Sequence, residues 1–185
     1  FGEAAILLRP GAPSRLGEAR AIAPELERRF ERVRVLEFGF VDGGDVLSTP
    51  HGVFIGMSAR TTAEGARALA AELGTLGLRS IVVQTPRDVL HLKSDCSLLD
   101  DDTILATPRL AVTGIFDELR VVRVPEGEEC VANALRVNDR VLISDGYPRT
   151  ADLLGRLGFK TVPLDTREVA KVDAGLSCMS LRWRN

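Results

Sequence analysis

The sequence has few of the residues on which metal sites and disulfide scaffolds depend. Its 185 residues include two histidines and three cysteines, and the cysteines at 96, 130 and 178 form no Cys-x-x-Cys pair. An odd number of widely spaced cysteines argues against a disulfide framework and favours a reducing, cytoplasmic compartment. The same shortage of ligands argues against a structural zinc site.

Excess charge and long apolar runs are also lacking. The net charge of −2 provides no basic surface for nucleic acid or for an anionic membrane. No apolar run reaches the roughly 18 residues of a membrane-spanning helix, and Phe1-Gly2-Glu3 does not open a signal peptide. Because 45% of the residues are hydrophobic and 27% are charged, we expect a globular protein with one domain over residues 1–185.

A phrase of glycine, small residues and arginine recurs along the chain, each time before a helical pattern and a strand. The arginines stand at 15, 60 and 149, so the first gap is 45 residues and the second, 89, is about twice as long. The skipped copy centres on Pro108-Arg109, in a segment with little helical pattern. A period of about 45 residues is typical of repeat architectures, although a βαβ protein can show it by chance.

Each repeat is predicted to contain a strand hairpin, a helix and a further strand. The helical patterns cover residues 19–30, 66–76 and 153–157, and the strands after them cover 33–36, 80–83 and 160–164. The hairpins pair 46–48 with 53–55, 96–99 with 103–106, and 134–137 with 141–144, and a first strand covers 4–8. One helix per unit predicts an α/β propeller with strands inside and helices outside.

Capping residues refine the predicted helix boundaries. Thr61 with Glu64 fits a capping box, and Gly77 fits a C-terminal stop. Pro24 lies inside the first helical pattern and is expected to end or kink that helix.

Three side chains on separate segments could form an activated-thiol site. Cys178 follows the flexible stretch Ala174-Gly175-Leu176-Ser177, His91 alternates with leucines, and Asp42 opens Asp42-Gly43-Gly44-Asp45. A thiol, an imidazole and a carboxylate are the groups that such catalysis needs. Structural roles are open for each: a small buried thiol, a core histidine and a tight turn. We interpret the other two cysteines, 96 and 130, as buried structural residues.

Charged residues near the helix starts have two readings. Arg15 and Arg60 precede helices, where a cation opposes the macrodipole, so either an anionic ligand group or solvent is expected beside them. The glutamates at 126, 128 and 129 are predicted to form a solvated acidic turn.

Five phrases, taken in order, resemble the dimethylarginine dimethylaminohydrolase family of the guanidino-modifying (pentein) superfamily. Any one phrase is weakly specific, but the five run through essentially the whole chain. They are Arg9-Pro10-Gly11-Ala12-Pro13-Ser14-Arg15, Asp42-Gly43-Gly44-Asp45-Val46-Leu47, Gly56-Met57-Ser58-Ala59-Arg60-Thr61, Leu90-His91-Leu92-Lys93-Ser94, and Lys171-Val172-Asp173 with Ser177-Cys178.

The resemblance implies a five-bladed, pentein-type α/β propeller of ββαβ units that hydrolyses N-methylated arginine to citrulline and a methylamine. It implies no metal or organic cofactor and a small-molecule substrate, and a homo-oligomer is compatible with it.

The resemblance also assigns a role to each site residue. Cys178 is the nucleophile, His91 the general acid and base, and Asp42 the carboxylate that completes the site. The other site residues bind substrate: Arg15 and Arg60 hold its carboxylate, and Asp173 with the backbone of Val172 meets its amino end.

The chain departs from the family pattern at two points. It begins after a Phe-x-Glu-Asp stretch that grips the guanidinium in the family, so about one N-terminal blade is expected to be missing. Met179 stands where a second cysteine is frequent.

Two other functions stay open. An arginine deiminase would usually show His-x-Asp, and here Lys93 takes the place of that aspartate. The other alternative is a non-catalytic guanidino-binding relative.

Overall fold

The computed structural model describes residues 2–182. They divide into two compact units, which we call the N-terminal unit (residues 2–91 with 181–182) and the C-terminal unit (residues 92–180). The expected single domain over residues 1–185 stays a prediction.

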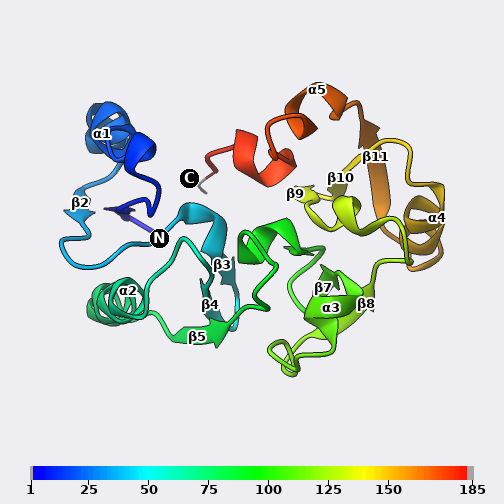
Figure 1. Cartoon of the computed structure of the whole chain (residues 1–185), viewed down its shortest axis with the longest axis horizontal. Helices are drawn as coiled ribbons and strands as arrows, with labels where there is room; N and C mark the ends of the chain where they lie inside the picture. The colour runs from blue at the N-terminus through cyan, green and yellow to red at the C-terminus, as the bar shows by residue number, and fades with distance from the viewer. Residues whose placement is uncertain (1, 183–185) are drawn as a thin grey trace. The chain divides into compact units, whose positions relative to one another are not determined.

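The N-terminal unit contains two small sheets with one helix each (Figure 1). Strand β1 (Ala4–Leu7) pairs in parallel with β2 (Arg32–Val35), and α1 (Glu18–Arg29) connects them. Strand β4 (Gly52–Met57) pairs antiparallel with β3 (Val46–Thr49) and parallel with β5 (Ser80–Gln84), which follows α2 (Ala63–Thr75). Single 3-10 turns, η1 (Pro13–Arg15) and η2 (Gly43–Asp45), precede α1 and β3.

The C-terminal unit repeats the second of these patterns twice. In the first copy, η3 (Leu92–Ser94) precedes β6 (Cys96–Leu98), β7 (Thr103–Ala106), α3 (Pro108–Ala111) and β8 (Arg120–Arg123). In the second, η4 (Glu129–Ala132) precedes β9 (Leu135–Val137), β10 (Arg140–Ser144), α4 (Pro148–Arg156) and β11 (Lys160–Leu164). Helix α5 (Arg167–Ala170) and the turn η5 (Leu176–Met179) follow.

The strand order confirms the predicted ββαβ units. In each three-stranded sheet of residues 2–182, the central strand pairs antiparallel with the strand before it and parallel with the strand after the helix. The skipped copy near Arg109 is present, and its helix, α3, has only four residues. The weak helical pattern there had predicted this.

Each unit has its own apolar core. In the N-terminal unit, the buried face of α2 packs on β4 and on the chain after β2, as its 3.6-residue period predicted. This core comprises Leu36, Val41, Val53, Ile55, Ala66, Leu69 and Leu73. The core of the C-terminal unit lies between its two sheets and α4 and includes Leu105, Val122, Val141, Ile143 and Leu154.

The predicted N-cap of the second helix was wrong, and the first helix does not end at its proline. The N-cap of α2 is Thr62, whose hydroxyl accepts the backbone N–H of Gly65, because Thr61 turns its own hydroxyl to a buried carboxylate. Helix α1 continues through Pro24. No residue of α1 is buried, so water can hydrate the backbone carbonyl that the proline leaves without a partner.

Two predictions about burial were also wrong. Cys130 is exposed and lies on η4 rather than on a strand, whereas Cys96 is buried as expected. Glu128 is 5% exposed, not part of a solvated turn. Its carboxylate accepts hydrogen bonds from the backbone and hydroxyl of Thr150 in the first turn of α4, where a negative charge is favourable.

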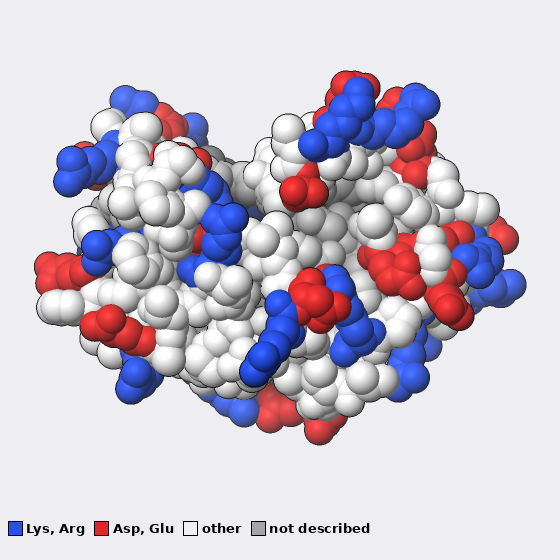
Figure 2. All heavy atoms as spheres, viewed as in Figure 1, with Lys and Arg blue, Asp and Glu red and all other residues white. Residues whose placement is uncertain are grey.

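The surface carries charges of both signs in small groups. Figure 2 shows Lys and Arg next to Asp and Glu over the viewed face, consistent with the net charge of −2. Within residues 2–182, no helix combines the length and the apolar character that a membrane crossing requires.

Candidate active site

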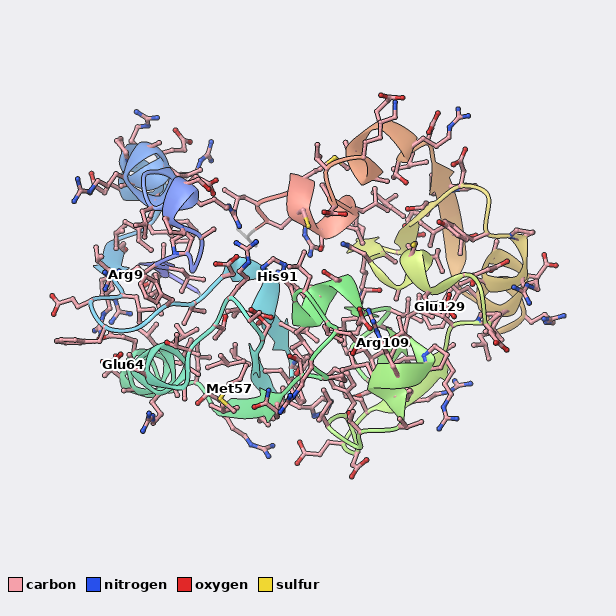
Figure 3. The ribbon with its side chains drawn as sticks, viewed as in Figure 1. Arg9, Met57, Glu64, His91, Arg109 and Glu129 are labelled. Atoms are coloured by element: carbon pink, nitrogen blue, oxygen red, sulfur yellow. The ribbon has the colours of Figure 1, made fainter. Side chains whose placement is uncertain are left out.

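The centre of the site in the N-terminal unit is a buried carboxylate with a histidine. Asp42 is 1% exposed, and its Oδ2 lies 2.8 Å from Nε2 of His91, which directly precedes η3 (Figure 3). Gly11 donates its backbone N–H to Oδ1 at 2.7 Å, and Nη1 of Arg15 lies 3.2 Å from Oδ2. The carboxylate therefore joins three segments of the unit.

These partners keep Asp42 ionised. Burial acts to raise the pKa of Asp42, but the hydrogen bonds from His91 and Gly11 and the positive charge of Arg15 outweigh burial and lower that pKa. Because an ionised carboxylate only accepts hydrogen bonds, Nε2 of His91 carries a proton and Nδ1 is the nitrogen left for proton transfer.

Gly44 allows the imidazole to lie against the backbone of η2. A Cβ atom at this position would lie 2.7 Å from Cγ of His91. The sequence is compatible with a tight turn here or with a close approach of the backbone to a ligand. The segment does form the turn η2, and the group that lies against Gly44 is the imidazole of His91.

A second buried acid near Asp42 is Asp45, which the sequence did not reveal as functional. The Oδ2 atom of Asp45 accepts hydrogen bonds from Ser58 Oγ and Thr61 Oγ1, each at 2.6 Å. Thr61 Oγ1 in turn accepts the backbone N–H of Asp42 at 3.2 Å, and Ser58 Oγ accepts that of Arg60 at 3.0 Å. Asp45 thus supports the backbone of two predicted site residues.

Most of the helix-leading arginines have carboxylate partners within the protein. Arg15 pairs with Asp42 and Glu18. Equivalent pairs in the C-terminal unit join Arg109 with buried Asp95 and Arg149 with Glu128. An anionic ligand is therefore not needed to explain a cation at these positions.

Arg60 differs from these arginines. Its guanidinium has no hydrogen bond or ion pair with any residue that the structure describes. Its carbonyl packs on Gly11, where an added Cβ would lie 2.3 Å from the oxygen. The turn that carries Arg60 therefore touches the segment that leads to Arg15, which supports the predicted pair of arginines.

The remaining predicted residues belong to the C-terminal unit. Cys178 is exposed on η5, and its backbone N–H donates to the carbonyl of Gly175 at 3.1 Å. Val172 is 75% exposed. Asp173 is also exposed and adopts a left-handed φ of 55°, which is uncommon outside glycine but better tolerated by Asp than by most residues.

The turn that carries Cys178 contacts one buried amide that sequence reasoning missed. Asn133, directly after η4, accepts the backbone N–H of Ser177 through Oδ1 at 3.0 Å, and its Nδ2 lies 3.9 Å from Sγ of Cys178. The only signal in the sequence was a polar residue between the apolar residues Ala132 and Ala134.

The predicted residues thus fall into two groups. Asp42, His91, Arg15 and Arg60 belong to the N-terminal unit, and Cys178, Val172 and Asp173 to the C-terminal unit. Among residues 2–182, no three His, Cys, Asp or Glu side chains are grouped so that they could hold a metal ion.

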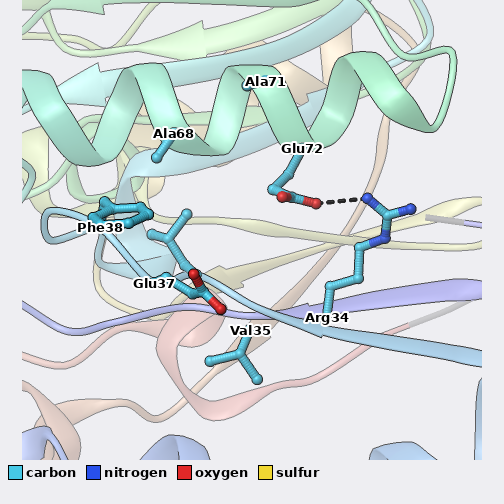
Figure 4. A pocket seen from close by; sticks show the side chains of 8 residues that line it. Arg34, Val35, Glu37, Phe38, Ala68, Ala71 and Glu72 are labelled. Carbon is cyan, nitrogen blue, oxygen red and sulfur yellow. Dashed lines mark hydrogen bonds and ion pairs between the residues drawn. The ribbon is translucent and has the colours of Figure 1, made fainter.

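The N-terminal unit also has a surface pocket that other residues line. The pocket lies between α2 and the segment 34–38, which begins in β2. Phe38 and the Arg34–Glu72 ion pair border the pocket (Figure 4). None of its lining residues belongs to the predicted site.

Comparison with known proteins gives a consistent set of relatives. Residues 28–143 match the family model for arginine deiminase. The chain is 40% identical over 183 residues to an N(G),N(G)-dimethylarginine dimethylaminohydrolase of Pseudomonas aeruginosa, covering 97% of this chain and 71% of that protein. A protein of the same name from Streptomyces coelicolor is 36% identical over 186 residues and is covered to 70%.

Solved structures agree with this. The dimethylarginine dimethylaminohydrolase of Pseudomonas aeruginosa, as a cysteine-to-serine variant with citrulline, superimposes with a TM-score of 0.94 at 39% identity, covering 99% of this chain and 72% of that one. A cyanobacterial arginine dihydrolase domain gives a TM-score of 0.85 at 21% identity over 98% of this chain and 71% of that one. The second likeness concerns the fold alone.

Proposed function

Since this chain belongs to the dimethylarginine dimethylaminohydrolase family, we propose that it hydrolyses N-methylated arginine to citrulline and a methylamine. The observation that carries the proposal is the buried Asp42–His91 pair, with 2.8 Å between Oδ2 and Nε2. A carboxylate that fixes one imidazole nitrogen leaves the other for general acid and base catalysis, as a hydrolase of this type requires.

In the proposed first step, the thiolate of Cys178 attacks the central carbon of the substrate guanidinium. A C–S bond forms, and His91 protonates the methylated nitrogen as the C–N bond breaks and the amine leaves. The product of this step is a covalent thiouronium on the cysteine. The exposure of Cys178 supports access of the substrate to the sulfur.

In the second step, water attacks the thiouronium carbon while His91 accepts a proton from that water. The C–S bond then breaks, the electron pair returns to the sulfur of Cys178, the remaining hydroxyl proton passes to solvent, and citrulline is released. Asp42 lies beside the imidazolium that forms at His91 in this step, with 2.8 Å between Oδ2 and Nε2, and so stabilises it electrostatically.

We propose that the arginines and the segment before η5 orient the substrate. The guanidinium of Arg60, which has no partner among residues 2–182, is available to the substrate carboxylate, and Arg15 lies on the segment that contacts the Arg60 turn. Asp173 and the backbone of Val172, a 75% exposed residue, would receive the amino group. A bidentate arginine–carboxylate pair is well suited to such positioning.

Citrulline release tests the proposal directly. Protein of recorded intact mass is supplied with asymmetric dimethylarginine or with arginine, and citrulline is measured. Release from the methylated substrate, lost on Cys178→Ser, is the expected result. Undiminished release by the Cys178→Ser variant would contradict the mechanism.

A second candidate reaction is the deimination of arginine, which the match of residues 28–143 to the arginine deiminase model favours. Lys93, two residues after His91, stands where those enzymes usually carry an aspartate that grips the guanidinium. Release of citrulline and ammonia from arginine, at a higher kcat/KM than from dimethylarginine, would establish this alternative.

We also propose a reducing, cytoplasmic location. The three cysteines are free thiols, which supports this placement.

A further inference from the structure

We propose that Asn133 is a catalytic residue whose side-chain amide holds the Cys178 turn and donates a hydrogen bond to the nucleophilic sulfur. The inference rests on the proposed function, because it takes Cys178 as the nucleophile. It concerns residues of the C-terminal unit only.

Asn133 is placed rigidly beneath the turn. It ends η4, lies between buried Ala132 and Ala134, and is itself 8% exposed. Forty-four residues later in the chain, Ser177 donates its backbone N–H to Oδ1 of Asn133 at 3.0 Å. A buried amide whose oxygen is engaged in this way has little freedom to rotate.

The contact with Ser177 determines which end of the amide faces the sulfur. A backbone N–H is only a donor, so the oxygen of Asn133 must face Ser177. The NH2 group is then directed to the other side, where Nδ2 lies 3.9 Å from Sγ of Cys178. The sulfur therefore faces a donor.

Gly175 shows that the turn is built around this amide. A Cβ atom at Gly175 would lie 2.3 Å from Nδ2 and 2.5 Å from Cγ of Asn133, so only glycine permits the observed approach. Leu176, next in the chain, is 4% exposed and anchors the turn on the apolar side. Two adjacent residues thus fix the turn against Asn133.

The chemistry of the proposed reaction uses this arrangement twice. A hydrogen-bond donor beside the sulfur favours the thiolate over the thiol, and the thiolate is the attacking form. The same donor stabilises the sulfur again when the C–S bond breaks in the second step. Asn133 itself forms no covalent bond.

Cys96 provides the contrast within the same unit. Its sulfur donates to the carbonyl of Leu92 at 3.2 Å, so it faces an acceptor, and burial raises the pKa of its thiol. Both features favour the protonated form. The environment of Cys178 therefore differs from that of a structural cysteine.

The substitution Asn133→Asp separates the two contacts of the amide. The acid keeps an oxygen for Ser177 but replaces the donor at the sulfur with a second acceptor that carries negative charge. We expect alkylation of Cys178 by iodoacetamide near neutral pH to slow about tenfold, with its pH midpoint raised, and kcat to fall with little change in KM.

Asn138→Asp is the matched control. It makes the same change of shape and charge on an exposed residue in the turn between β9 and β10. Mass spectrometry of the separate cysteine peptides measures each rate, with Cys130 as the exposed reference and Cys96 as the buried one. We expect the control to alkylate at Cys178 and to turn over substrate as the unmodified protein does.

The outcomes separate the inference from the proposed function. One outcome is that Asn133→Asp keeps the alkylation rate and the kcat of the unmodified protein while Cys178→Ala abolishes turnover. That outcome would overturn the role of Asn133 alone. A loss of turnover matched by a lower Tm, with the alkylation profile of Cys178 unchanged, would also overturn it, since the residue would then be structural. Retained turnover in Cys178→Ala would overturn the proposed function itself.

Discussion

Asp42 and His91 meet at 2.8 Å although 49 residues separate them in the chain. The contact depends on Gly44, against which the imidazole lies. It also depends on the burial of the Asp42 carboxylate, since that residue is 1% exposed. The pair gives this histidine of a leucine-rich segment an ionised partner, which supports its proposed catalytic role.

The first prediction concerns the charge of the Asp42 carboxylate. Asp42→Asn keeps an acceptor for Gly11 but loses the ionic interaction with His91, so we expect kcat to fall by about 100-fold or more. Steady-state release of citrulline measures the effect. Asp139→Asn is the control, since Asp139 pairs with Lys160 on the exposed surface of the other unit; an equal loss in that variant would contradict a specific role for Asp42.

The second prediction concerns Asp45, which organises the segment around the site. Asp45→Ala leaves the Ser58 and Thr61 hydroxyls without their buried acceptor, which we expect to cost about 1–3 kcal/mol in the free energy of unfolding. KM is also expected to rise, because Ser58 holds the backbone of Arg60. Urea denaturation and steady-state kinetics measure the two effects.

Asp152→Ala, on the exposed face of α4, is the reference substitution for Asp45→Ala. It should leave both the unfolding free energy and KM close to those of the unmodified protein. Equal values for the two variants would show that the Asp45 network does not support the site.

The third prediction follows from the lowered pKa of Asp42. A group with a depressed pKa in the folded state stabilises the protein above its unfolded pKa of about 3.9, and this stabilisation is lost as the pH falls through the folded pKa. The unfolding free energies of the unmodified protein and of Asp42→Asn should therefore converge in acid. A difference between them that is constant from neutral to acidic pH would contradict this.

The secondary structure was predictable from local patterns in the repeat, whereas most of the contacts within the site were not. Alternating and 3.6-residue patterns are local, so β3, β4 and α2 could be located from the sequence. Contacts such as Asn133 with Ser177 and Asp45 with Thr61 depend on tertiary approach and leave no periodic signal.

Charged residues misled the sequence reasoning for a related reason. An arginine before a helix suggested an external anion, and an acidic triplet suggested a solvated turn. In the fold, Arg15 pairs instead with Asp42 and Glu18, and Glu128 is buried at the start of α4, where it pairs with Arg149. The sequence alone does not show which charges meet inside the protein, whereas the motifs around Asp42, His91 and Cys178 had predicted the candidate residues.

The last prediction uses the two adjacent glycines of η2 as a matched pair. Gly44→Ala places a methyl group 2.7 Å from Cγ of His91, a distance at which something must shift, so we expect kcat to fall at least about tenfold through displacement of the imidazole. Gly43→Ala meets only Cδ1 of Leu8, at 4.0 Å, and should retain activity. Both positions have negative φ, so alanine introduces no backbone strain at either. Steady-state kinetics and Tm are measured for both variants. Similar activities would show that the close packing of His91 on this glycine is not needed for catalysis.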